Sequence, residues 1–399
     1  MYPIENDLIT AQVSRVFQIE SITWGDQNTP AQAYLARYQG KLRQKDSETA
    51  YDQLAKALRP MNITPLFREE SSNQYIILLS GVQKPTPSNP RLNLILFGLT
   101  FLSVLVTGAI YGHDGTTPLT QYMLNNVGNA IAFTISILGI LLAHEFGHYL
   151  VARFHKTAAT LPFFIPFPFS PLGTMGAVIV QKESHRNRRI LLDIGIAGPI
   201  AGLVVAIPVL LLGLSLSEVN NLPQVLQPGQ AFQLEGNSIL YLLAKYLVFG
   251  QLLPSPADYG GLTPLFYWVR YFFTGLPDPM GGMDVMLHPV AWAGWAGLLV
   301  TALNLIPAGQ LDGGHIVNGL LGKRSKLLYP IVLVGLVLLG LVWSGWWLWA
   351  GLVFFLGRQQ AEPLDQITPL DRRRKALGFL GILIFFLVFT PVPIRILFG

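Results

Sequence analysis

The sequence predicts a polytopic α-helical membrane protein of about six to eight spans, with a re-entrant β element, preceded by a small soluble α+β domain. Of its 399 residues, 51% are hydrophobic and only 12% are charged, whereas soluble domains carry about 25% charged residues. The charge is also uneven, because residues 1–90 hold nine Lys or Arg and nine Asp or Glu, while the remaining 309 hold only 18 and 13. The chain has no cysteine, which excludes disulfides and thiolate metal sites. We therefore expect any metal to be held by His, Asp or Glu.

Residues 1–83 are expected to form the soluble domain. The first residues, MYPIENDLITAQ, carry two acids and no apolar run, so they indicate neither a signal peptide nor a transit peptide. Residues 34–42 have the pattern of a strand, residues 47–60 that of an amphipathic helix with Ser47 as its N-cap, and residues 63–80 that of a strand hairpin.

Residues 84–90, KPTPSNP, are expected to be a Pro-rich linker into a membrane domain of residues 91–399. About 20 apolar residues are needed to span a bilayer. The predicted spans are residues 92–111, 128–154, 190–214, 285–306, 327–343 and 376–392. Residues 346–357 are too few for a span, so we expect either a hairpin with the preceding segment that turns at Ser344 or one long kinked helix. Basic residues on both flanks favour the hairpin. The apolar segment 237–250 carries Lys245, which favours an interfacial or re-entrant helix over a span.

The basic residues predict the orientation of the chain. With the N-terminal domain inside, 15 of the 18 Lys and Arg that follow Pro90 lie on the inside, and only Lys245, Arg270 and Arg395 lie outside. We therefore expect a cytoplasmic N-terminus. Because the basic excess belongs to the membrane part, it predicts no nucleic-acid partner.

The second predicted span ends in HEFGH, residues 144–148. On a helix, His144 and His148 lie on one face and can bind one zinc ion, while Glu145 is placed to act on a water molecule at the metal. The alternative is a polar cluster at a helix end that faces water. The uncharged run 128–143 favours the zinc site, because ionisable groups in an apolar segment are costly unless they are paired or bind a metal.

A zinc site that keeps one position open needs a third protein ligand. The segment NLIPAGQLDGGH, residues 304–315, ends the fourth predicted span at the same depth as HEFGH, and its proline and three glycines disfavour a regular helix. Asp312 is the natural third ligand, with a helix N-cap as the alternative. His315 is a competing ligand, but we expect it beside the ligands or at the surface. Asn304 is expected to donate a hydrogen bond to a developing oxyanion or to the substrate backbone, with helix packing as the alternative.

The pairing of HExxH with N-x-x-P-x-x-x-L-D-G resembles the site-2 protease family of intramembrane zinc metalloproteases. The strings HPVAWAGWAGLLVTALNLIPAGQLDGGH and AEPLDQITPLDRRRK are similar to the plastid and cyanobacterial branch called ethylene-dependent gravitropism-deficient and yellow-green proteins. The resemblance covers most of residues 92–375. It implies that His144, His148 and Asp312 bind Zn2+, that Glu145 is the catalytic base and that Asn304 assists. It also implies a transmembrane protein substrate in the lipid bilayer of a bacterial inner or thylakoid membrane.

Two further segments are expected to shape the site. Residues 160–184 contain four prolines that forbid a helix, and Gly176–Val180 has the pattern of a short strand. Such a strand could hold an unwound substrate by β-augmentation; the alternative is a plain interfacial loop. In the third span, Gly195, Gly198 and Gly202 form a small-residue face that we expect to serve helix packing near the site.

The sequence thus predicts an intramembrane zinc metalloprotease that hydrolyses peptide bonds of transmembrane substrates. A zinc or proton-coupled transporter is the first alternative, because intramembrane His and Asp also mark ion pathways. A non-catalytic membrane assembly factor is the second. Glu145 argues against both, because neither transport nor scaffolding needs a general base.

Overall fold

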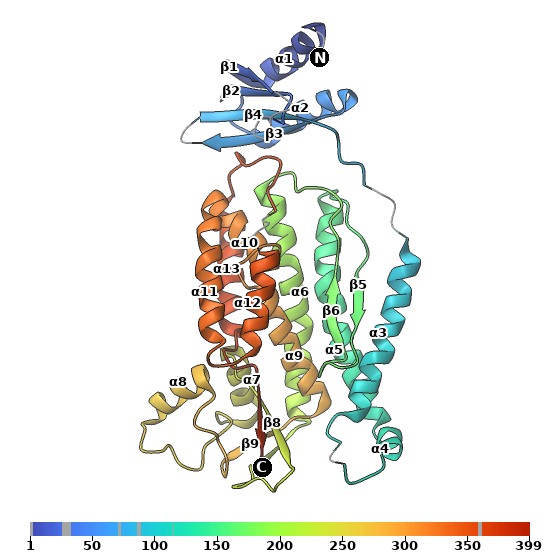
Figure 1. The fold of residues 1–399 in the computed structure, drawn as a ribbon, viewed down its shortest axis with the longest axis vertical. Helices are drawn as coiled ribbons and strands as arrows, with labels where there is room; N and C mark the ends of the chain where they lie inside the picture. Colours follow the sequence, from blue (N-terminus) through green and yellow to red (C-terminus); the bar gives the residue numbers. More distant parts are fainter. Residues whose placement is uncertain (1–2, 26–32, 71–72, 86–88, 114, 358–360) are drawn as a thin grey trace.

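The structure is a computed structural model that shows a small α+β unit at one end of an elongated helical body (Figure 1). The N-terminus lies in the α+β unit, and the C-terminus lies at the opposite end of the molecule. The described residues are 3–25, 33–70, 73–85, 89–113, 115–357 and 361–399.

The α+β unit contains a four-stranded antiparallel sheet with strand order β1-β2-β4-β3. Its elements are α1 (Pro3–Val16), β1 (Phe17–Trp24), β2 (Ala36–Leu42), α2 (Ser47–Leu58), β3 (Ile63–Glu70) and β4 (Asn73–Ser80). The predicted strand, helix and hairpin are confirmed, and α2 buries Ala50, Leu54 and Leu58 in the core of the unit. The prediction lacked α1 and β1. Strand β1 exposes most of its side chains, so it carries no alternating apolar pattern to reveal it.

The predicted N-cap of α2 is wrong by one residue. The cap is Asp46, whose carboxylate accepts a hydrogen bond from the Glu48 backbone N–H at 3.3 Å. Ser47 is buried instead, and its hydroxyl donates to the Asp365 carboxylate at 3.2 Å. A partner 318 residues away leaves no signal near Ser47 in the sequence.

Three helices are long and apolar enough to cross a membrane, among the residues that the structure describes. They are α3 (Pro90–Ile110), α5 (Val127–Phe154) and α6 (Arg188–Ser215), which match the first three predicted spans. The linker prediction for residues 84–90 falls partly on residues 86–88, which lie outside the described residues.

The fourth predicted span, 285–306, is shorter than expected. Its first residues belong to strand β9 (Met283–Met286), and helix α9 (Pro289–Asn304) has 16 residues, a length of about 24 Å. Almost the whole of α9 is buried, because it packs against α5 and α6. A turn joins α9 to helix α10 (Asp312–Leu321).

The predicted hairpin near Ser344 is confirmed. Helices α11 (Leu328–Leu339) and α12 (Gly345–Leu356) pack against each other, and the Trp347 indole N–H donates to the Val337 carbonyl across the turn. The last helix, α13 (Arg372–Val388), begins four residues before the predicted position because Asp371 caps it. Since α9, α11, α12 and α13 are each shorter than 18 residues, the count of six to eight spans stays a prediction.

The end of the helical body farthest from the α+β unit carries short elements. They are α4 (Leu119–Asn125), β7 (Glu218–Asn221), β8 (Ala231–Glu235), α7 (Ile239–Phe249), α8 (Pro264–Thr274) and β10 (Ile394–Phe398). Strand β7 pairs with β9, and β8 pairs with β10. These pairings join segments that are far apart in the sequence.

Helix α7 has 11 residues and is too short for a span, so the interfacial or re-entrant placement of this segment stays a prediction, but the environment of Lys245 was not predicted. Its side chain is fully buried, with Nζ 3.9 Å from Glu235 Oε1 and 3.9 Å from Asp284 Oδ1. Strands β8 and β9 bring these two carboxylates to Lys245. The burial of Lys245 therefore depends on tertiary contacts that its apolar helix does not reveal.

The predicted re-entrant β element is a two-stranded antiparallel sheet of β5 (Phe163–Pro166) and β6 (Thr174–Val178). Strand β6 begins two residues before the predicted Gly176. Beyond β6, the Thr160 and Val180 residues still exchange hydrogen bonds. Figure 1 shows this sheet beside α5, on the side that faces α3.

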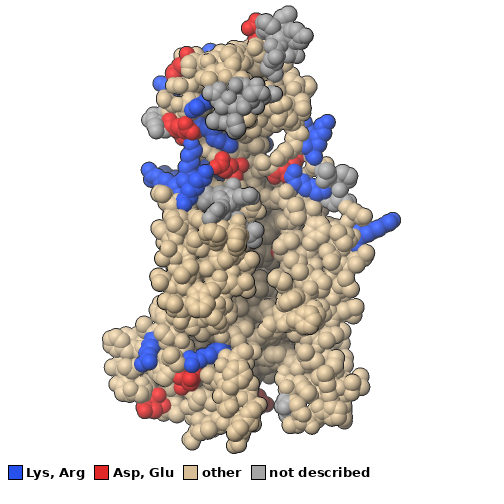
Figure 2. Space-filling model, in the orientation of Figure 1, with Lys and Arg blue, Asp and Glu red and all other residues tan. Residues whose placement is uncertain are grey.

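Charged residues gather in two bands in the view of Figure 2. One band lies where the α+β unit meets the helical body, and a smaller one lies at the opposite end. The surface between the bands shows no Lys, Arg, Asp or Glu among the described residues in this view. Such an uncharged belt is what a bilayer requires of the surface that contacts it.

Candidate metal centre

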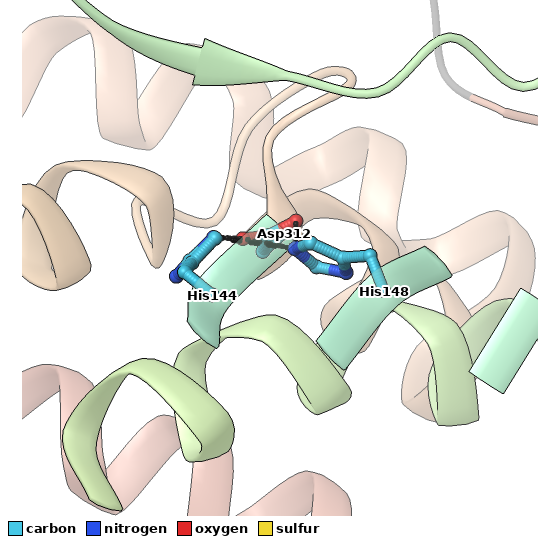
Figure 3. Close-up of side chains that lie close together, drawn as sticks. All are labelled: His144, His148 and Asp312. Carbon is cyan, nitrogen blue, oxygen red and sulfur yellow. Dashed lines mark hydrogen bonds and ion pairs between the residues drawn. The ribbon is translucent and has the colours of Figure 1, made fainter. Parts of the chain in front are cut away.

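Helix α5 presents two histidines one turn apart, and the start of α10 presents an aspartate to both (Figure 3). His144 Nε2 lies 3.2 Å from Asp312 Oδ2, His148 Nε2 lies 3.2 Å from Asp312 Oδ1, and the two Nε2 atoms are 3.2 Å apart. Both imidazoles are buried. Among the described residues, these three form the one group of His, Asp and Glu side chains whose ligand atoms converge in this way.

The separations fit a tetrahedral zinc ion. Two atoms that are each about 2.1 Å from a tetrahedral metal lie about 3.4 Å apart, close to the three observed distances of 3.2 Å. Two imidazoles and one carboxylate are also a donor set that zinc accepts while keeping a fourth position open for substrate or water.

The turn between α9 and α10 brings Asp312 to α5. Gly309 adopts a left-handed conformation with φ of 57°, which glycine tolerates without strain. A Cβ at Gly313 would lie 2.0 Å from the Leu305 carbonyl oxygen, so the backbone folds back closely there. Asp312 is the first residue of α10 and caps no backbone N–H, because Leu311 is the N-cap residue. The N-cap alternative for Asp312 is thus unsupported. The helix which that alternative assumed does form, and Gly313 and Gly314 lie inside it, against the expectation that these glycines disfavour a regular helix.

Helix α6 holds the histidine rings in place. His148 Nδ1 pairs with the Ile194 carbonyl at 2.7 Å, which leaves Nε2 free for a metal. A Cβ at Gly198 would lie 2.0 Å from His148 Nε2, and one at Gly202 would lie 3.2 Å from His144 Nδ1. The prediction that this glycine face serves packing near the site is confirmed.

All five predicted site residues line one cavity of about 570 Å³. Glu145 is buried and lines this cavity together with Ile179. The Asn304 amide nitrogen lies 3.3 Å from His144 Nε2, so Asn304 lies beside the three converging residues. Residues 177–185 line the wall opposite α5 and include the end of the predicted strand.

Two further histidines lie in the same cavity. His315 is outside the group of converging ligand atoms, as expected for a residue beside the ligands. His185 was not predicted to be near the site, and its ring centre lies 5.7 Å from that of His315. Burial lowers the pKa of His185 to about 3, with a smaller contribution from His315, so its imidazole is neutral at physiological pH. A lone His in a loop gave no signal of this position.

Comparison with known proteins agrees with a metal-binding role for this group of residues. The model of peptidase family M50 matches residues 132–342. The probable chloroplastic zinc metalloprotease EGY1 of Arabidopsis thaliana is 33% identical over 277 residues, which are 67% of this chain and 44% of that protein. Its counterpart from Oryza sativa subsp. japonica is 30% identical over 286 residues, 70% of this chain and 43% of that protein.

The probable chloroplastic zinc metalloprotease EGY2 of Arabidopsis thaliana is 30% identical over 266 residues, 65% of this chain and 41% of that protein. The chain thus spans less than half the length of these curated relatives. No solved structure matches the chain.

Proposed function

This chain belongs to peptidase family M50, and from that membership we propose that it is a zinc metalloprotease that hydrolyses peptide bonds of membrane-spanning proteins. The resemblance to site-2 proteases and to their plastid and cyanobacterial branch is confirmed by the family match and by the EGY relatives. Family membership and three long apolar helices identify a helical membrane protein.

We assign His144, His148 and Asp312 as the zinc ligands, Glu145 as the general base and Asn304 as a hydrogen-bond donor. When bound, zinc supplies Lewis-acid chemistry that polarises a peptide carbonyl and acidifies a water molecule. Glu145 accepts a proton from the attacking water and passes it to the leaving amine. The Asn304 amide donates to the oxygen that gains negative charge. The observation that carries this proposal is the mutual 3.2 Å spacing of the three ligand atoms in a cavity that also contains Glu145.

The edge of β6 is proposed to hold the unwound substrate. The only strand with which β6 pairs among the described residues is β5, and Ala177–Val180 line the cavity. A helical substrate hides its peptide bonds in its own hydrogen bonds, so an edge strand offers it replacement partners. Ala177→Pro or Ile179→Pro should abolish cleavage and leave the zinc content unchanged, and undiminished cleavage by either variant would contradict this role.

The placement of the chain is proposed from its charge pattern and relatives. We place the α+β unit on the cytoplasmic side of a bacterial inner or thylakoid membrane, as a soluble domain of residues 1–83, followed by the linker 84–90 and the membrane domain 91–399. The chloroplastic relatives favour a thylakoid-type membrane. The charged band between the α+β unit and the helical body supports the inside orientation of that end (Figure 2).

The proposed activity is tested with Glu145→Gln. The full-length wild type and variant are reconstituted in lipid nanodiscs with a membrane-spanning protein substrate, and both cleavage and bound zinc are measured. We expect the variant to keep its zinc and to lose at least about 100-fold in turnover, because general-base catalysis contributes 10²–10⁴-fold. A variant that cleaves as fast as the wild type would refute the role of Glu145. A wild type that moves zinc across liposomes without cleaving protein would indicate a transporter.

A further inference from the structure

The sheet of the α+β unit continues into the helical body through two segments that are far apart in the sequence. Strand β3 is an edge strand of that sheet, and Phe67 pairs in parallel with Asp365. The Phe67 N–H donates to the Leu364 carbonyl at 2.9 Å, and the Gln366 N–H donates to the Phe67 carbonyl at 3.1 Å. Residues 364–366, which lie between α12 and α13, therefore extend this edge of the sheet by one parallel β-bridge.

Residues 185–187 pair with the backbone of this segment as well. The Leu364 N–H donates to the His185 carbonyl at 2.9 Å, and the Asp365 N–H donates to the Arg186 carbonyl at 2.8 Å. Asn187 is the parallel partner of Asp365. Residues 185–187 are thereby attached to the α+β unit through the backbone of residues 364–366.

Residues 185–187 end the cavity segment, which we define as residues 177–187. At its other end, Ile179 lines the cavity together with Glu145, as do the rest of residues 177–185. One continuous segment thus lines the cavity of Glu145 at one end and pairs with residues 364–366 at the other. Figure 3 shows a green strand and the coil that follows it crossing the view above the three metal-binding candidates.

The Asp365 side chain connects α2 of the α+β unit with residues 367 and 368. It is fully buried, and its carboxylate accepts hydrogen bonds from the Ser47 hydroxyl at 3.2 Å, from the Ile367 N–H at 2.8 Å and from the Thr368 N–H at 3.2 Å. The Thr368 hydroxyl also donates to it. Leu364 and Ile367 pack against the core of the α+β unit. Because Ser47 belongs to α2, its hydrogen bond to Asp365 ties the α+β unit to residues 364–366.

We propose that Asp365 is a positioning residue that fixes the cavity segment against Glu145 by docking the α+β unit. The inference rests on the proposed peptidase function and adds a role for the N-terminal residues. With the segment held, substrate meets a preformed edge. Without it, binding has to order the segment first, and that cost weakens substrate affinity.

Asp365→Ala tests this role in the full-length protein. Loss of a buried carboxylate that accepts several hydrogen bonds should raise KM for a membrane-spanning substrate about tenfold. The turnover number kcat and the zinc content should stay within about twofold, because the proposed ligands and Glu145 are unchanged. Asp365→Asn keeps an acceptor oxygen and should restore most of the affinity. Ser47→Ala removes one donor from the opposite side and should raise KM about threefold. This milder variant tests the proposal even where Asp365→Ala fails to fold.

A second measurement requires no catalysis. Because the chain has no cysteine, Gln181→Cys places a single thiol in the cavity segment. In a Glu145→Gln background, Asp365→Ala should increase the rate of thiol modification at position 181 about tenfold. Glu20→Ala, at an exposed position of β1, is the matched control and should change neither KM nor the modification rate.

The two readouts decide the proposal together. A rise in KM with faster modification supports it. An unchanged KM, a lower KM, a loss confined to kcat, or an unchanged modification rate would each overturn it. If neither the wild type nor any variant cleaves protein, the peptidase proposal fails, while the modification rates still report whether Asp365 positions the segment.

Discussion

Two clusters of buried ionisable residues lie in the helical body, one towards the α+β unit and one at the opposite end. In the first, His144, His148 and Asp312 converge at 3.2 Å beside a cavity of about 570 Å³. In the second, Lys245 lies 3.9 Å from the carboxylates of Glu235 and Asp284. The cavity that Glu235 lines has a volume of about 20 Å³.

The two clusters differ in the source of their positive charge. The second cluster contains its own cation, and Tyr241 adds a hydroxyl that donates to Glu235 at 2.7 Å. The first cluster has a carboxylate and two imidazole nitrogens aimed at one point, an arrangement that a metal ion completes. Burial of ionisable groups therefore does not identify a functional site by itself; converging ligand atoms beside an open cavity do.

Replacing Asp312 should separate the two clusters most strongly. Asp312→Asn leaves a neutral, weaker ligand, and zinc affinity should fall by more than about 100-fold, since loss of an outer-shell partner alone costs 10–100-fold. Asp284→Asn, in the second cluster, should leave zinc affinity within about twofold. Zinc titration with a competing chelator measures both. Equal zinc binding by the wild type and Asp312→Asn would remove Asp312 from the ligand set.

A smaller loss of zinc affinity is expected from Gly198→Ala. The new Cβ would lie 2.0 Å from His148 Nε2, so the ring or helix α6 has to shift, and zinc affinity should fall about tenfold. Gly139→Ala is the matched control, because nothing lies within 4 Å of its Cβ position. It should leave zinc affinity unchanged and stabilise its helix by up to about 1 kcal/mol. Similar affinities for the two variants would show that α6 does not constrain the ligands.

The smallest effect on zinc is expected from Lys245→Met, which should act on stability alone. Removing the cation leaves Glu235 and Asp284 buried without their partner and should lower the free energy of unfolding by about 3 kcal/mol. Lys326→Met removes an exposed lysine that pairs with Glu362 at 2.7 Å, and should cost less than about 1 kcal/mol. Thermal unfolding and zinc content are measured on both. Zinc loss in Lys245→Met without loss of stability would contradict the structural role of the second cluster.

The convergence of His144, His148 and Asp312 could be predicted from the sequence because the segments that carry them have local signals. HEFGH places two histidines one helical turn apart, and a charged residue is conspicuous after an apolar run. The prediction of Asp312 required one further inference. The basic residues indicate that the ends of the two predicted spans lie at the same depth in the membrane. The geometry agrees with that step, since Asp312 lies at the two histidines.

The parts that escaped prediction depend on partners distant in the sequence. Lys245 is buried by strands β8 and β9, Ser47 is bound by Asp365, and His185 reaches the cavity through its backbone pairing with Leu364. Neither hydropathy nor periodicity contains these pairings. The same reason explains why the extended sheet between the α+β unit and the helical body went unrecognised.

X-ray absorption at the zinc K-edge of the full-length protein tests the central claim most directly. The claim predicts one zinc per chain with four nitrogen or oxygen ligands at about 2.0–2.1 Å, two imidazoles in the wild type and one in His148→Ala. Absence of zinc from the purified wild type, or an identical spectrum for the wild type and His148→Ala, would contradict it.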